Sequence, residues 1–517
     1  MIKVLQLGND DWSKRYKIPT DYHWHFNDFP EKKSEAEKAK AKTKKKKRKG
    51  YDVVLVTDGA TLDTAYWNKL TWMVDPYHVI YMPGVEETLN QAGKEFLKCS
   101  AAEKMMEDPQ VVIDHLENRY FFGQSGVRMF PTNIFLNESK VNEYEVLDSC
   151  NLKVKVNTHD QWVNIGSYRN SLYIDPKRLI KLWLTYRQHN VQVRLRIFIQ
   201  PAGTNGDPDD NHVLTIDSNS DKELYLPIEP SDQARFACVT IEVKGDGDLT
   251  IGLLHSRWGR EGRGEFIAGG KRIVNMEKRE DIPYFFSPGD LKPPLTVYFS
   301  GARISAGFEA FPLFRKLKTP TLLFTDVRLS LGQFYADDDD FMGKAIIKVI
   351  EDTLRKLGFT KRQLIMNGTS MGSYASLLYG GQIGAYIINV TKPLANLGYI
   401  ASRGRLQRPD DFEAIYDIDN QLVPSLDSKH LHELDERFWK KFNKLDLSNS
   451  RLFVGYMKND DFDNKTMGRL IKSPAVKNSM QFTYKGFPGR HNDNRTIILW
   501  FIDRLNQVLE SDFGRKY

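Results

Sequence analysis

The C-terminal half of the chain alternates short apolar runs with stretches of helical periodicity. The apolar runs lie at 295–299, 321–325, 363–367, 385–390, 451–457 and 480–484. Short continuous apolar runs are typical of strands buried on both faces, and strands that alternate with helices indicate a parallel sheet. We therefore predict an α/β domain over 284–517, in which amphipathic stretches at 401–448 form a candidate lid.

The middle of the chain shows a different pattern, in which apolar and polar residues alternate. Examples are 152–156, 191–199 and 238–243, and loops rich in Gly, Asp and Pro separate them. A period of two residues is typical of strands with one buried face. The pattern predicts an all-β, sandwich-like domain over 146–283.

Residues 1–145 combine apolar strands with helical segments. The expected strands at 4–8 and 51–59 run into Gly or Asp turns, and 85–106 is expected to be helical. No glycine-rich dinucleotide or phosphate-binding motif follows these strands, so the sequence does not support nucleotide binding. We predict a small doubly wound α/β domain that carries a Lys-rich insert at 32–49.

The most specific motif is Gly-x-Ser-x-Gly, formed by Gly368, Ser370 and Gly372 directly after an apolar run. A helix pattern of small residues follows it. This strand–turn–helix context is typical of the nucleophile elbow of the α/β-hydrolase fold, in which glycines let strand and helix approach closely. We therefore predict that the C-terminal domain has this fold and that Ser370 is its nucleophile.

The α/β-hydrolase fold places an acid and then a histidine after its nucleophile. An acidic cluster follows the apolar run at 451–457, and His491 is the only histidine beyond it. Asp460 comes first after the strand and is our choice of acid, with Asp461 as the alternative. All three candidates, Ser370, Asp460 and His491, fall on loops after predicted strands.

Each residue type suits acyl transfer. A serine hydroxyl needs a base to take its proton, histidine titrates near neutrality, and a carboxylate orients the imidazole. Backbone N–H groups must then stabilise the oxyanion. The Met371 N–H directly follows the nucleophile, and the loop after 295–299 offers the N–H of Gly301 or Ala302 as the second donor.

The formal net charge of +7 comes from one segment. Residues 32–49 contain eleven Lys and Arg against two Glu, which leaves the rest of the chain near −2. Such a block is typical of a solvated loop, whereas a nucleic-acid-binding fold spreads its basic surface over the domain. We expect no nucleic acid partner. The insert also suits contact with an anionic membrane surface.

Cysteine usage and hydropathy indicate the compartment. Cys99, Cys150 and Cys238 are scattered and lack Cys/His metal-ligand spacing, so we expect neither disulfides nor a metal site. No apolar run reaches the length of about 18 residues that a membrane span needs. We expect a cytoplasmic protein without a tightly bound cofactor.

Several long signatures carry a resemblance to a known family. They lie at 4–13, 24–26, 324–329, 332–335, 376–380 and 392–398. Together with the elbow they resemble the second accessory secretory protein of the accessory Sec system of Gram-positive bacteria. The resemblance runs from the first strand to the C-terminal helix and leaves out the insert at 32–49.

The resemblance implies a cytoplasmic protein that associates with the membrane through partners. These partners are the other accessory Sec proteins, the accessory motor ATPase and a glycosylated serine-rich repeat adhesin that the system exports. It also implies O-acetylation of N-acetylglucosamine on the adhesin by a Ser–acid–His triad, which falls here on Ser370, Asp460 or Asp461, and His491. An acetyl donor is implied, and its identity is left open.

Two alternatives to a transferase remain open at this point. Water in place of the sugar hydroxyl would make the protein a carbohydrate or acyl esterase. A secretion factor that acts only through binding would not need the triad.

Overall fold

The computed structural model describes residues 2–28, 50–205, 207–222, 224–226, 231–407, 414–493 and 495–515. The Lys-rich insert at 32–49 lies outside the described residues. Contacts group the chain into two compact units. The first unit comprises Met1–Gly123, Arg260–Gly269 and Ser287–Leu291, and the second comprises the remaining segments.

The first unit contains a five-stranded parallel sheet of order β2-β1-β3-β4-β5. Its strands are β1 (Ile2–Leu7), β2 (Tyr22–Phe26), β3 (Val53–Val56), β4 (Val79–Tyr81) and β5 (Glu103–Lys104). Its helices are α2 (Thr64–Leu70), α3 (Val85–Thr88), α4 (Gln91–Cys99) and α5 (Pro109–Arg119). A small N-terminal α/β domain is thus present, as its apolar strands predict.

The helix expected at 85–106 is wrong in detail. The segment contains the short α3, then α4, then β5. Asn90 separates the two helices, because its side chain accepts a hydrogen bond from the Gly93 N–H and caps the start of α4. Asparagine favours such a helix start over a helix interior, so a local signal for the break was present in the sequence.

The all-β part forms a ten-stranded sheet built on two long antiparallel strands. These are β12 (Ile180–Pro201) and β15 (Arg235–Trp258), which run past each other with register shifts. Their neighbours are β6 (Gly126–Met129), β7 (Ile134–Leu136), β8 (Glu143–Asp148), β9 (Asn151–Asn157), β10 (Val163–Tyr168), β11 (Leu172–Ile174), β13 (Asp209–Thr215) and β14 (Leu224–Tyr225). Alternate side chains of these strands, such as Val193 and Val239, share one buried core.

The third sheet has eight strands in the order β16-β17-β19-β18-β20-β21-β22-β23. Six strands are parallel to one another: β18 (Leu295–Phe299), β19 (Thr321–Phe324), β20 (Leu364–Thr369), β21 (Ile387–Thr391), β22 (Arg451–Met457) and β23 (Gln481–Phe487). They match the six apolar runs of the sequence. The antiparallel pair β16 (Gly270–Asn275) and β17 (Glu280–Ser287) extends one edge of the sheet.

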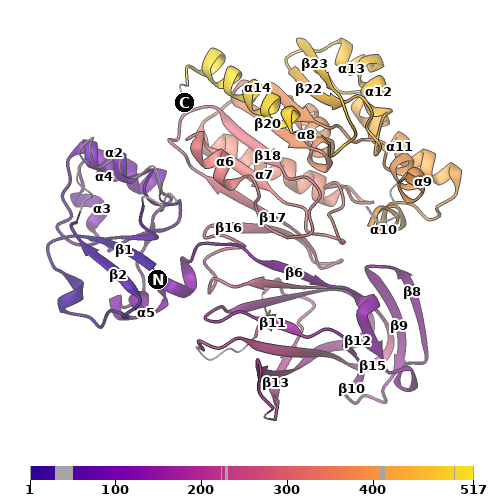
Figure 1. The fold of residues 1–517 in the computed structure, drawn as a ribbon, viewed down its shortest axis with the longest axis horizontal. Coiled ribbons are helices and arrows are strands. Elements are labelled where there is room, and N and C mark those ends of the chain that lie inside the picture. The colour runs from indigo at the N-terminus through magenta and orange to yellow at the C-terminus, as the bar shows by residue number, and fades with distance from the viewer. Residues whose placement is uncertain are drawn as a thin grey trace. The chain divides into compact units, whose positions relative to one another are not determined.

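Helices cover both faces of this sheet (Figure 1). They are α6 (Phe311–Lys316), α7 (Phe341–Leu357), α8 (Met371–Ile383), α12 (Thr466–Lys472), α13 (Pro474–Lys477) and α14 (Thr496–Phe513). Adjacent residues of β18 point to opposite faces. Tyr298 contacts Phe314 of α6 and Phe501 of α14, whereas Phe299 contacts Tyr379 of α8. Among the described helices, none combines the length and apolarity that crossing a membrane requires.

Helix α8 and strand β20 approach closely through glycine. A Cβ atom at Gly372 would lie 2.1 Å from the Phe299 carbonyl oxygen. A Cβ atom at Gly368 would lie 2.2 Å from the carbonyl oxygen of Gly372. Both neighbours are backbone atoms and have no rotamer to change, so the sequence must keep glycine at these positions to hold the helix against the sheet.

The sheets divide the chain at different points from the expected boundaries. β6 and β7 precede residue 146 and already belong to the ten-stranded sheet. β16 precedes residue 284, β17 begins before it, and both belong to the eight-stranded sheet. A strand-like sequence does not show which sheet the strand will join, so the sequence alone does not assign this pair. The three-domain division remains a prediction.

Three helices, labelled in Figure 1, follow β21 and precede β22 along the chain, and they make up the segment expected as a lid. They are α9 (Leu397–Gln407), α10 (Ala414–Leu422) and α11 (Ser428–Phe442). Phe438 of α11 contacts Tyr374 of α8, with ring centroids 4.9 Å apart. Asp417 of α10 accepts a hydrogen bond from the Ser149 N–H in the β8–β9 turn at 3.1 Å. The three helices are therefore anchored to both α8 and the all-β part.

Asp419 and Asp435, two of the buried carboxyl groups of these helices, have raised pKa values. Asp419 of α10 is fully buried, and within the described residues neither of its side-chain oxygens has a hydrogen-bond partner. Burial and then the charge of Asp435 raise the pKa of Asp419 to about 8. Burial also raises the pKa of Asp435 to about 6. Near neutral pH the folded protein therefore keeps Asp419 protonated.

Gly372→Ala should lower the free energy of unfolding by about 1–3 kcal/mol, because the methyl group overlaps the Phe299 carbonyl. Urea denaturation measures the change. Gly468→Ala in α12 is the matched control, since a Cβ there meets nothing within 4 Å. A gain of up to about 1 kcal/mol is expected for this control. Equal stabilities for the two variants would contradict the close approach.

Asp419→Asn should flatten the pH dependence of stability. The folded state binds the Asp419 proton more tightly than the unfolded state, so the contribution of this group to stability is fully present below the unfolded pKa of about 4 and is lost as pH rises toward about 8. An amide at 419 does not titrate. Urea denaturation at pH 5 and pH 8 should show a smaller difference for Asp419→Asn than for the wild type. The same difference in both would contradict a buried, protonated Asp419.

Candidate active site

Ser370 occupies the turn between β20 and α8. Its backbone angles are φ 53° and ψ −125°, a conformation that is strained for a residue with a side chain. The Ser370 N–H donates to the Thr391 carbonyl at 3.0 Å, and the Ser373 hydroxyl donates to the Ser370 carbonyl at 2.6 Å. These bonds hold the turn that raises the hydroxyl above the sheet, as expected for a nucleophile elbow.

The structure brings His491 and Asp460 to this serine. The Ser370 Oγ lies 2.9 Å from His491 Nε2, and His491 Nδ1 lies 2.8 Å from Asp460 Oδ2. Asp460 follows β22 and His491 follows β23, and the carboxyl ends of these parallel strands meet at one edge of the sheet. The imidazole and the carboxylate are each 4% exposed. Because Nδ1 faces a carboxylate, Nε2 is the nitrogen that can accept the serine proton.

The two adjacent acids have different partners. The second oxygen of Asp460 accepts hydrogen bonds from the N–H groups of Phe462 and Asp463, at 2.9 and 3.1 Å. These bonds fix the carboxylate that faces the imidazole. Asp461 instead accepts a hydrogen bond from the His491 backbone N–H at 3.0 Å. Asp461 therefore orients the loop that carries the histidine, and it does not face the ring nitrogen.

The expected oxyanion donors lie beside Ser370. Met371 is the first residue of α8, and the N–H groups of a helix's first turn have no partner within the helix. The Cβ position of Gly301 is 3.7 Å from Ser370 Cβ, so the loop after β18 adjoins the nucleophile. The Gly301 N–H donates to Glu309 Oε1 at 3.3 Å. Glu309 must release this N–H before Gly301 can bind an oxyanion.

Glu309 was not predicted from the sequence. Its carboxylate accepts a hydrogen bond from the Tyr298 hydroxyl at 3.1 Å and forms an ion pair with Arg303 at 3.4 Å. The residue lies at the far end of the loop that begins at Gly301. Proximity to Ser370 follows from the loop path, which no local pattern reveals.

Lys392 is a second residue that the sequence analysis missed. It follows β21 directly and has a left-handed backbone, with φ 52°. Burial lowers the pKa of Lys392, and the charges of Asp460 and Asp493 oppose this effect. Lys392 therefore adds a cation close to the candidate acid. Its position after a parallel strand was an available signal, because functional residues gather at the carboxyl ends of such strands.

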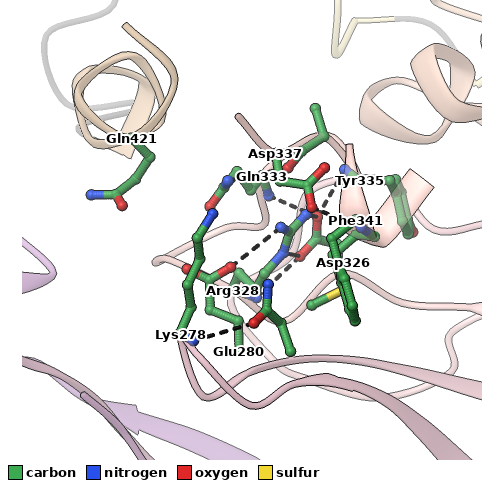
Figure 2. A network of polar contacts seen from close by, with 12 residues as sticks. Lys278, Glu280, Asp326, Arg328, Gln333, Tyr335, Asp337, Phe341 and Gln421 are labelled. Carbon is green, nitrogen blue, oxygen red and sulfur yellow. Dashed lines mark hydrogen bonds and ion pairs between the residues drawn. The ribbon is translucent and has the colours of Figure 1, made fainter. Parts of the chain in front are cut away.

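A buried polar network lies next to the loop after β18, which carries Gly301 and Ala302. Figure 2 shows Arg328 between the carboxylates of Asp326 and Glu280. Arg328 donates to Asp326 at 2.9 and 2.8 Å, and Asp326 also accepts the Tyr335 N–H at 2.8 Å. The Tyr335 hydroxyl donates to the Ser300 carbonyl at 3.0 Å. The network thus connects the loop after β19 to the residue that precedes Gly301.

The described residues contain no group of three or more His, Cys, Asp or Glu side chains arranged to hold a metal ion. Ser370, His491 and Asp460 have the geometry for nucleophilic acyl transfer without such a group.

Comparisons with known proteins agree over the whole chain. A protein-family model described as "Accessory Sec system GspB-transporter" matches residues 2–515. The accessory Sec system protein of this family from Streptococcus gordonii is 33% identical, with 100% of this chain and 99% of the relative covered. The relative from Staphylococcus aureus is 30% identical, with 99% and 97% covered.

A solved structure shares the complete fold. It is described as the "Glycosylation Associate Protein (Gap123) complex from Streptococcus agalactiae", and its matching chain superposes with a TM-score of 0.87 at 27% identity. The match covers 100% of this chain and 99% of that chain. With the family model and both relatives, it shows that the chain belongs to the accessory Sec system GspB-transporter family, the second accessory secretory protein.

Proposed function

We propose that the chain is a serine-dependent O-acetyltransferase that modifies N-acetylglucosamine on a serine-rich repeat adhesin exported by the accessory Sec system. The observation that carries the catalytic part is the hydrogen-bonded series Ser370–His491–Asp460 on three strand-end loops. Membership of the accessory Sec family supports the exported substrate.

In the first half-reaction, Ser370 Oγ attacks the carbonyl carbon of the acetyl donor and passes its proton to His491 Nε2. The carbonyl oxygen becomes an oxyanion that the Met371 N–H and a donor of the Gly301–Ala302 segment stabilise. Asp460 stabilises the imidazolium. The intermediate collapses, the donor's leaving group takes the proton from His491, and acetyl-Ser370 remains.

In the second half-reaction, a sugar hydroxyl attacks acetyl-Ser370 while His491 removes its proton. Collapse of the second tetrahedral intermediate returns that proton to Ser370 Oγ and releases the O-acetylated sugar. Water at the same position would give hydrolysis. The choice between transferase and esterase is therefore set by which molecule reaches acetyl-Ser370 first.

A second role in export is independent of this chemistry. The solved structure of similar fold is described as a Gap123 complex, which supports other accessory Sec proteins as partners of this chain. We place the protein in the cytoplasm, at the membrane surface through those partners and the motor ATPase. The two roles separate in a catalytically inactive variant.

Ser370→Ala should abolish covalent labelling by a fluorophosphonate, because the reagent forms its bond to the serine oxygen. Intact-mass spectrometry should show one adduct on the wild type and none on the variant. Ser402→Ala removes an exposed serine on α9 and should label like wild type. In cells, Ser370→Ala should remove O-acetyl groups from the adhesin while export continues. Retained acetylation would reject the assignment of Ser370, and loss of both would reject two separate roles.

Asp460→Asn should lower kcat about 10⁴-fold, because an amide stabilises neither the correct imidazole tautomer nor the imidazolium. Asp461→Asn is the matched control on the adjacent residue. It should lower kcat less than about 10-fold, since an amide oxygen still accepts a hydrogen bond such as that from the His491 N–H. Turnover of p-nitrophenyl acetate measures both. A larger loss for Asp461→Asn would exchange the roles of the two acids.

A further inference from the structure

Arg128 connects the all-β part of the second unit to two loops of the eight-stranded sheet. It lies on β6, and its side chain donates to four backbone carbonyls. Nη1 donates to Arg303 and Ile304 at 3.2 and 3.0 Å. The other two acceptors are Val327, 3.0 Å from Nε, and Ser330, 2.6 Å from Nη1. The first pair belongs to the loop after β18 and the second to the loop after β19.

The first of these loops begins with the candidate oxyanion donors. Gly301 and Ala302 directly precede the carbonyls that Arg128 binds. Ala302 packs against the core of the eight-stranded sheet, whereas the Ile304 side chain is 83% exposed and adds little packing. At residues 303 and 304 the backbone carbonyls are bound by Arg128, so this polar contact helps to set the path of the loop beyond Ala302.

The second loop is fixed independently. Arg328 and the Tyr335 N–H both bind Asp326, as Figure 2 shows, and Asp326 is almost fully buried. Val327 lies between Asp326 and Arg328. By binding the Val327 carbonyl and the Arg303 carbonyl together, Arg128 ties the exposed oxyanion loop to a rigid neighbour.

The contact uses two nitrogens of the guanidinium. Nε donates to the Val327 carbonyl, and Nη1 shares its two hydrogens among the other three carbonyls. A lysine ammonium presents all of its donors from one atom, so it cannot reproduce both positions. Burial lowers the pKa of Arg128 to about 10, because a cation loses solvation there. The four carbonyl oxygens supply the compensating hydrogen bonds. Such a buried cation persists only where its contacts are well made.

We propose that Arg128 is a positioning residue for acyl transfer, which holds the loop that supplies the second oxyanion donor, either the Ala302 N–H or the Gly301 N–H once Glu309 has released it. The inference rests on the proposed function. It gives the all-β part an indirect role in catalysis. Arg128 acts through the loop backbone and does not touch the acyl group.

The test compares Arg128→Lys, Arg128→Ala and the control Arg178→Met in the full-length chain, with p-nitrophenyl acetate as substrate. Arg178 is also an arginine of the all-β part, and its side chain stacks on Trp258. Arg128→Lys and Arg128→Ala should lower kcat about 100-fold with KM nearly unchanged, as expected for a misplaced group that acts in the transition state. Arg178→Met should behave as wild type.

Chemical rescue separates positioning from general damage to the fold. Guanidinium chloride, at concentrations too low to denature, should restore part of the kcat of Arg128→Ala and none of that of Ser370→Ala. A merely destabilised protein would lose activity with added guanidinium, because the ion is a denaturant.

The outcomes distinguish the two proposals. Wild-type turnover that depends on Ser370, together with full kcat in Arg128→Lys, would overturn the role of Arg128 and leave the proposed function intact. Loss of activity in Arg128→Ala that added guanidinium does not restore would also overturn it. Absence of Ser370-dependent turnover in the wild type would reject the proposed function and this inference with it.

Discussion

Helix α8 lies so close to the end of β18 that a methyl group at Gly372 would come within 2.1 Å of the Phe299 carbonyl oxygen. This backbone contact forces the chain to turn sharply at Ser370, whose φ of 53° is unfavourable for a residue with a side chain. The sharp turn directs the serine hydroxyl toward His491. The loops after β18, β22 and β23 then contribute the remaining groups around that one fixed point.

The linear order of the chain contained much of the candidate site. Ser370 and His491 could be predicted because the elbow is a local motif and only one histidine follows the acidic cluster. The choice between Asp460 and Asp461 could not be made in the same way. The two residues are adjacent and chemically identical, and the bonds to the Phe462 and Asp463 N–H groups turn Asp460 toward the ring.

Predictions of the fold were accurate where periodicity has one interpretation. The six apolar runs became the six parallel strands, because burial on both faces leaves little room for polar residues. A strand-like sequence does not show which sheet the strand joins: most of the pair β16–β17 falls within the range expected for the all-β domain, yet the pair extends the parallel sheet. Long-range contacts were also beyond prediction. Arg128 and the Arg303 carbonyl are 175 residues apart, and no pattern near either residue indicates the other.

The order of synthesis determines when the contacts of Arg128 and Ser370 can form. Every strand of the ten-stranded sheet, β6 to β15, precedes Leu295 in the chain. Synthesis proceeds from the N-terminus. The strands of this sheet, with the Arg128 guanidinium, are therefore made before the loops at 300–304 and 325–330 leave the ribosome. Ser370 in turn is made before Asp460 and His491, so the candidate serine gains its hydrogen-bonded partners only when the last strands of the eight-stranded sheet have been synthesised.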